Sequence, residues 1–155
     1  MHSDFVMVLA AVAGTLGFSI IFSVKPQRLI FAVLGGIIAC IGYLATGVFG
    51  VFISNMVGAF AATIYSELIA RVQRAPIVTF VTPSIIVLVP GGSLYYTMAN
   101  ILTKDYETAY LYGLKTLDSC LGIAAGILVA SLIMNIILNT IKNTKRKRED
   151  KQKNI

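Results

Sequence analysis

Four long stretches of this chain hold almost no charged residue, and their length limits the possible folds more than any other feature. They cover residues 5–24, 29–45, 48–70 and 118–141, and a fifth of similar length, 77–101, contains prolines and glycines. A helix needs ~20 apolar residues to cross the ~30 Å hydrocarbon core of a bilayer. With 57% hydrophobic and 13% charged residues, the chain has too little polar surface for a soluble fold. We predict an all-α membrane protein with five transmembrane helices, the fourth discontinuous.

The segment between the fourth and fifth stretches is mixed in character. Its larger side chains recur every three to four residues, as in an amphipathic helix: Tyr106, Tyr110, Leu114 and Leu117. Tyrosine suits the headgroup level of a membrane, so we expect a short interfacial helix before the fifth span. Asp118 and Ser119 are then expected to cap that span. Residues 1–141 form one transmembrane domain, and 142–155 form a basic tail.

The basic residues predict the orientation, because positively charged loops stay in the cytoplasm. Seven of the thirteen Lys and Arg residues lie in the tail, which has no aromatic residue for stacking on bases. A cytoplasmic anchor therefore explains the tail better than a nucleic-acid site. We expect a multi-pass protein of the cell membrane with its N-terminus outside and its C-terminus inside. Two connections between apolar stretches would then also lie in the cytoplasm. One contains Lys25 and Arg28, and the other contains Arg71 and Arg74.

The run Pro90-Gly91-Gly92 lies inside the fourth stretch and is its most informative feature. A proline within a helix removes a backbone hydrogen bond and costs ~3 kcal/mol. Freed backbone groups are tolerated in a membrane only where protein or a cavity satisfies them. A half-helix that begins near Gly92 would direct the N–H groups of Gly92 and Ser93 into such a cavity. These groups could form a binding site for a carboxylate. The alternative is a kink packed against a neighbour, which is what we predict for Pro83 alone.

Polar residues inside apolar spans also carry information. Asn55 could contact a substrate or form a hydrogen bond between helices. Glu67 precedes Arg71 by four residues, so an ion pair is favoured over a proton relay. Cys40 and Cys120 lack partners at metal-ligand spacing, and the only histidine is the second residue. We therefore expect neither enzyme chemistry nor a metal or cofactor.

The length, the hydropathy profile and the basic tail resemble the small membrane half of the threonine/serine exporter family. The resemblance is sharpest at the pattern Pro90-Gly91-x-x-x-Tyr95, with Pro76 ahead of the span. In the split form of that family, as in a bacterial succinate exporter, a larger membrane subunit accompanies a chain of this size. The resemblance implies efflux of small carboxylate solutes, either amino acids such as threonine and serine or dicarboxylates such as succinate. It also implies site roles for Pro90, Gly91 and Tyr95, while Gly92 is a departure that makes the break a double glycine.

Five spans cannot divide into two equal inverted halves, between which transporters often place their site. The chain therefore looks incomplete, and we expect a hetero-oligomer with a larger subunit, with further copies of this chain as a second option. A non-transporting assembly subunit is the alternative function, and a channel lacks the expected filter or charged ring. The predicted substrate-binding residues are Asn55, Pro90, Gly91, Gly92, Ser93 and Tyr95.

Overall fold

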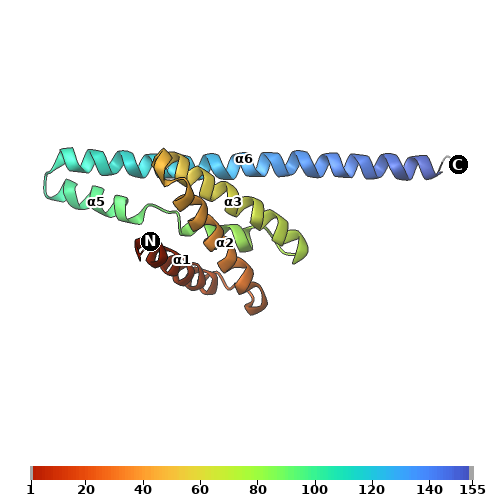
Figure 1. Cartoon of the computed structure of the whole chain (residues 1–155), viewed down its shortest axis with the longest axis horizontal. Helices are drawn as coiled ribbons and strands as arrows, with labels where there is room; N and C mark the ends of the chain where they lie inside the picture. The colour runs from red at the N-terminus through yellow and green to blue at the C-terminus, as the bar shows by residue number, and fades with distance from the viewer. Residues whose placement is uncertain (1, 154–155) are drawn as a thin grey trace.

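The computed structural model describes the backbone of residues 2–153 and the side chains of residues 5–140, and these residues are helical apart from short connections. The elements are α1 (His2–Ile21), α2 (Pro26–Ala45), the short 3-10 helix η1 (Gly47–Phe49), α3 (Val51–Val72), α4 (Val78–Ile86), α5 (Gly91–Leu102) and α6 (Tyr106–Lys153). The predicted all-α class is confirmed. Figure 1 shows α1 to α4 gathered on one side of α6, which is much longer than the other helices.

Proline, glycine and aspartate mark where several helices begin. Pro26 is the first residue of α2, where its missing N–H costs nothing. Gly50 precedes α3 with a φ of 100°, a conformation that other residues rarely adopt. Asp105 precedes α6 and accepts a hydrogen bond from the backbone N–H of Thr108 at 3.2 Å. Hydrogen bonds from Thr108 also lower the pKa of Asp105 below its ordinary value, so this cap stays ionised at neutral pH.

Small residues allow the central helices to pack closely. A Cβ added to Gly42 of α2 would lie 3.0 Å from the Cα of Gly58 in α3. A Cβ on Gly126 of α6 would lie 2.4 Å from the carbonyl oxygen of Met56, also in α3. Close backbone approach of this kind stabilises helix pairs in membranes. Near these contacts lies a buried core of small and aliphatic side chains: Ala39, Ala59, Ala62, Leu88 and Ile123.

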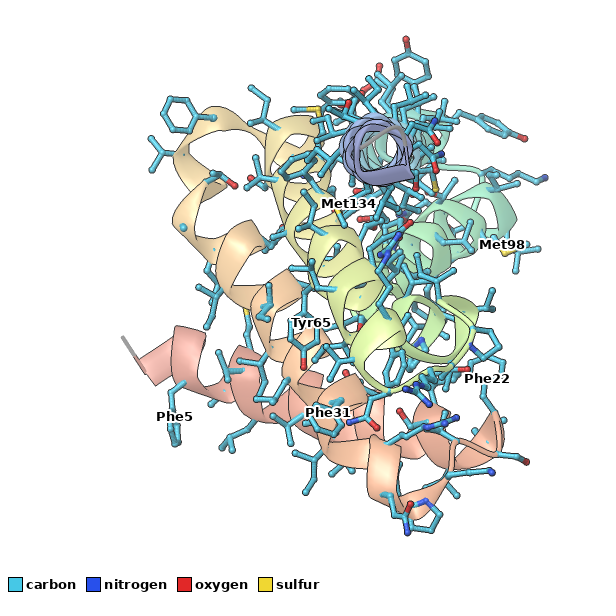
Figure 2. The ribbon with its side chains drawn as sticks, turned by 90° about the vertical axis from the view of Figure 1, so that its right-hand side faces the viewer. Phe5, Phe22, Phe31, Tyr65, Met98 and Met134 are labelled. Atoms are coloured by element: carbon cyan, nitrogen blue, oxygen red, sulfur yellow. The ribbon has the colours of Figure 1, made fainter. Side chains whose placement is uncertain are left out.

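At the other end of α3, polar groups join α3 and α4 to α2. The Tyr65 hydroxyl donates to the carbonyl oxygen of Phe31 at 3.1 Å. Figure 2 shows the Tyr65 side chain pointing toward Phe31. The Ser84 hydroxyl lies 3.3 Å from the carbonyl oxygen of Ala32. The predicted ion pair between Glu67 and Arg71 is confirmed, with a distance of 2.7 Å between the guanidinium and the carboxylate.

The structure corrects the prediction of a separate interfacial helix before the fifth span. Residues 102–117 and 118–141 do not form two elements, because α6 runs without interruption from Tyr106 to Lys153. Asp118 is not a cap, since Asp105 already caps the helix and neither proline nor adjacent glycines interrupt α6. The expected face is nevertheless present. Its four side chains are all exposed: Tyr106, Tyr110, Leu114 and Leu117.

Three helices are long and apolar enough to cross a membrane: α2, α3 and residues Tyr106–Thr140 of α6. The pair α4 and α5 passes the same test as one unit, with a bend of 51° at its break, which fits either a broken span or a re-entrant loop. The apolar part of α1 whose side chains are described, Phe5–Ile21, is shorter than these. The described part of the chain thus has three candidate spans, or four with the bent pair. The side chains of the predicted basic tail, 142–155, lie outside the described residues.

The break between α4 and α5 lies level with the first turns of α3. Leu88 packs against the position of Gly58, the eighth residue of α3. The break therefore lies beside the N-terminal half of α3. Beyond the break, α5 packs against the start of α6 and extends past α2 and α3 (Figure 1). Met98 of α5 is 63% exposed and points away from the protein (Figure 2).

Candidate functional site

The backbone between α4 and α5 leaves helical hydrogen bonding for one turn. The N–H of Leu88 donates to the carbonyl of Ile85 at 2.8 Å, and the N–H of Gly91 donates to that of Val89 at 2.8 Å. Regular bonding resumes with the N–H of Leu94, which donates to the carbonyl of Pro90 at 3.0 Å. No side chain caps α5.

The N–H groups of Gly92 and Ser93 lie between these bonds. Neither has an acceptor among the described residues. Both belong to the first turn of α5, where the helix dipole places partial positive charge. The break therefore presents two free donors at a positive helix end, which is the arrangement that binds anions at helix N-termini.

A cavity of about 590 Å³ opens beside this break. This volume lies within the range typical of small-molecule sites. Five of the six predicted site residues line it: Asn55, Pro90, Gly91, Gly92 and Ser93. The opposite wall is mostly apolar and comes from α1 and α2, through Met7, Ala10, Ala11, Gly14, Phe18, Cys40 and Tyr43.

Tyr95, the sixth predicted residue, does not line the cavity. It lies on the outer face of α5 with 67% of its surface exposed, and its ring is inclined at 74° to the Tyr96 ring with the two centroids 5.5 Å apart. The pattern that suggested it, Pro90-Gly91-x-x-x-Tyr95, spaces the tyrosine four residues after Gly91. The structure therefore does not bring Tyr95 together with the other five residues.

Lys115 and Ser119 of α6 line the cavity but were not among the predicted residues. Their spacing of four residues places both on one face of a helix, and this is the signal that could have found them. It was obscured because the sequence suggested a helix start at Asp118, between them. The Lys115 ammonium lies 5.3 Å from the centroid of the Tyr112 ring. Lys115 supplies the one full positive charge among the residues that line the cavity.

Asn55 is the most deeply buried polar group at the site, with 2% of its surface exposed. Its Nδ2 donates to the carbonyl oxygen of Val51 at 2.9 Å and lies 3.3 Å from the Ser119 Oγ. Because a carbonyl can only accept, the amide nitrogen must face Val51. The Asn55 Oδ1 then has no hydrogen-bond partner. A buried acceptor without a donor is costly, and most such groups in proteins are satisfied.

Gly91 and Gly92 face open space. A Cβ added to either would meet no atom within 4 Å, in contrast to Gly122 and Gly126, whose added Cβ atoms would lie 2.4 Å from carbonyl oxygens of α3. The glycines at the break are therefore not needed for helix packing. What they provide is free access to the backbone, and this favours a binding role over a packed kink.

The charges at the site match an anion. The free N–H groups of Gly92 and Ser93 carry partial positive charge and the Lys115 ammonium a full one, and the described residues that line the cavity include no Asp or Glu. Within the described residues, no cluster of three or more His, Cys, Asp or Glu side chains could hold a metal ion. The arrangement is suited to binding a small carboxylate beside an apolar wall.

Comparison with known proteins supports this account at the level of the family. The family described as "Threonine/Serine exporter, ThrE" matches residues 7–133, a range that contains the break and every residue lining the cavity. Comparison with curated proteins and with solved structures finds no match. The family resemblance seen in the sequence is thereby confirmed over most of the chain. The chain belongs to the threonine/serine exporter family.

Proposed function

We propose that this chain is the small subunit of a secondary transporter that exports small carboxylate-bearing solutes through the cavity at the α4–α5 break. The observation that carries the proposal is the pair of unbonded N–H groups, on Gly92 and Ser93, which open onto a cavity that also contains Lys115. The solute carboxylate would accept hydrogen bonds from both N–H groups, and Lys115 would add a screened attraction.

The break also provides a means of alternating access. Residues 87–90 are held by short turn bonds and not by regular helical hydrogen bonds, so this segment can absorb a change in backbone angles. Rotation of α5 against α4 would carry the Gly92 and Ser93 donors toward the other side of the membrane. Discontinuous helices perform this role in other secondary transporters.

A larger subunit would complete the site. Three large apolar residues that line the cavity keep much of their surface exposed: Met7 at 40%, Phe18 at 38% and Val89 at 54%. An open apolar wall cannot keep a polar solute apart from lipid, so another chain is needed to close it. We therefore propose a hetero-oligomer with a larger membrane subunit of the same family.

We also propose five crossings, with the bent α4–α5 pair as the fourth and the N-terminus outside. The guanidinium of Arg28 donates to the carbonyl oxygen of Gln73 at 3.1 Å, so the two basic connections lie together at one end of the protein. The later part of α6 extends beyond the same end of α3 (Figure 1). This grouping fits the positive-inside rule.

A cysteine introduced at Lys104 should react with a membrane-impermeant maleimide in intact cells, whereas one at Lys25 should react only after lysis. The reverse pattern would contradict this orientation.

The function predicts transport that requires both subunits. Vesicles are prepared from cells that express this chain, the larger subunit, both or neither, and are loaded with ¹⁴C-labelled L-threonine. Release should exceed the background about tenfold or more only when both are present. Release that is identical with and without this chain, while the larger subunit remains at the same level, would instead favour a non-transporting assembly role.

A further inference from the structure

Four basic residues form a cluster at the end of the protein where the α1–α2 and α3–α4 connections lie together. Lys25 and Arg28 lie at the first connection, where the N–H of Arg28 donates to the Lys25 carbonyl at 2.8 Å. Arg71 and Arg74 lie at the second, and the Arg28 guanidinium donates to the carbonyl of Gln73, the residue before Arg74. The candidate span α2 begins here and the candidate span α3 ends here, so the basic cluster lies at the level of the lipid headgroups.

The basic cluster carries more charge than the protein neutralises. The Arg71 guanidinium pairs with the Glu67 carboxylate at 2.7 Å. Within residues 5–140, neither Lys25 nor Arg74 has an ion-pair partner, and the Arg28 guanidinium bonds to a neutral carbonyl. Three of the four positive charges are therefore left without a counter-charge in this part of the chain. Anionic phospholipids offer negative phosphates at the same level of the membrane.

An open cavity of about 450 Å³ lies beside Arg71 and Arg74. Apart from Glu67, the rest of its lining is apolar: Ala70, Ala75, Pro76 and Ile77. Next to it, α3 and α4 expose Val72 at 75% and Val78 at 63%. The cavity thus joins a charged wall to an apolar surface. A phospholipid has the matching two parts, whereas free phosphate would leave the apolar part uncovered.

The backbone at Arg74 gives an independent reason to expect a ligand. Its φ of 46° lies in the left-handed region, which favours glycine. The N–H of Ala75 donates to the Ala70 carbonyl at 2.9 Å, a bond that closes many helices with a glycine at the position of Arg74. Arginine here strains a backbone that glycine would relax. Binding through the guanidinium would explain why the position holds a long, charged side chain.

We propose that this cavity binds the phosphate of an anionic phospholipid, with Arg74 as its main contact. A guanidinium binds phosphate through two parallel hydrogen bonds, which suits arginine better than other cations. Arg71, Arg28 and Lys25 add attraction from the same end of the protein. The inference is independent of the transported solute, because the cavity lies apart from the α4–α5 break.

Tryptophan fluorescence can test the site, because the natural chain contains no tryptophan. Val72→Trp places a reporter beside the cavity, and Leu102→Trp places one at the end of α5, where Leu102 is 83% exposed. Each full-length variant is reconstituted in nanodiscs of phosphatidylcholine and phosphatidylglycerol, with brominated acyl chains on one lipid or the other. Bromine quenches tryptophan on contact, so the two quenching levels give the relative affinity of the two lipids at each reporter.

The Val72→Trp reporter should prefer phosphatidylglycerol by at least about tenfold, and the Leu102→Trp reporter should show no preference. Adding Arg74→Gly to Val72→Trp should lower the preference about fivefold, the contribution of one basic residue near a membrane surface. Its melting temperature should equal or exceed that of Val72→Trp alone, because glycine suits the left-handed backbone.

Lys104→Gly, added to Val72→Trp, is the matched control. It also removes a positive charge from a residue with positive φ, here 63°, but Lys104 follows α5 and does not line the cavity. It should leave the preference unchanged. The basic residues of the tail are present in every variant, so the comparison isolates Arg74.

Three results would overturn the inference. The first is an equal preference at the two reporters, and the second is a preference that Arg74→Gly leaves unchanged. Either would mean that anionic lipid follows the overall charge and not this cavity. The third concerns inorganic phosphate, which should relieve quenching by brominated phosphatidylglycerol no more than chloride does at the same ionic strength. A larger effect of phosphate would identify a site for a soluble anion and not for a lipid.

Discussion

Replacing Gly92 with valine should reduce efflux at least about tenfold while the protein still inserts and folds. A Cβ at this position meets no atom within 4 Å, so the new side chain finds space without displacing a neighbour. It occupies the space in front of the free N–H groups of Gly92 and Ser93, where the carboxylate is expected to bind. A hydrogen bond to a charged group contributes about 1.5–3 kcal/mol, and each 1.4 kcal/mol corresponds to a factor of ten. The measurement is the initial rate of ¹⁴C-labelled L-threonine release, corrected for the amount of protein in the membrane.

Gly17→Val is the control for that experiment. Gly17 also has open space around an added Cβ and lies on α1, but it does not line the cavity. Efflux by this variant should match that of the wild type. Normal efflux by Gly92→Val would show that the N–H groups of the break do not contact the solute.

Replacing Gly126 with alanine should instead damage the fold. Its new Cβ would lie 2.4 Å from the Met56 carbonyl oxygen and 3.0 Å from the Ala59 Cβ, so α3 and α6 must separate. Overpacking of this kind typically costs about 1–3 kcal/mol. For a domain of this size, that cost lowers the melting temperature by roughly 2–12 °C. Thermal unfolding of the purified protein in detergent, followed by circular dichroism, measures the effect.

Gly113→Ala provides the comparison on the same helix. Its added Cβ would lie 3.7 Å from the Thr97 Cγ2, which is an ordinary contact. Alanine also favours a helix over glycine by about 1 kcal/mol. This variant should therefore melt at the same temperature as the wild type or slightly higher. Equal melting temperatures for Gly126→Ala and Gly113→Ala would mean that the close approach of α3 and α6 does not hold the bundle together.

Much of the backbone followed from local sequence. The apolar stretches became helices, and Pro90-Gly91-Gly92 interrupted the fourth stretch because proline and paired glycines act on the backbone directly, whatever the tertiary structure. The ion pair of Glu67 with Arg71 was also predictable, since its partners are four residues apart on one helix.

The features that could not be predicted from the sequence depend on which helices contact one another. Asp118 has the chemistry of a cap, yet α6 continues through it, because a capping residue only permits a helix to start and Asp105 already serves that purpose. The cavity required α1, α2, α3 and α6 to surround the break, and no local pattern specifies that assembly. Lys115 was therefore not among the predicted site residues. Tyr95 was predicted from the family resemblance alone, and in the structure it lies on the exposed face of α5.

Asn55 also shows what could and what could not be predicted from the sequence. Its position within an apolar span indicated that it must have a partner, but the sequence left open whether that partner was a helix or a solute. The structure identifies the helix partners of one of its two polar atoms. Nδ2 bonds within the protein, and Oδ1 remains unpaired.

The central claim is that the N–H groups of Gly92 and Ser93 bind the solute carboxylate. Its most direct test is the amide ¹H–¹⁵N spectrum of the complex, with glycine and serine of this chain labelled with ¹⁵N, during titration with L-threonine. The account predicts saturable downfield proton shifts at Gly92 and Ser93 and none at Gly17. Unmoved Gly92 and Ser93 signals at a threonine concentration that saturates transport would contradict it.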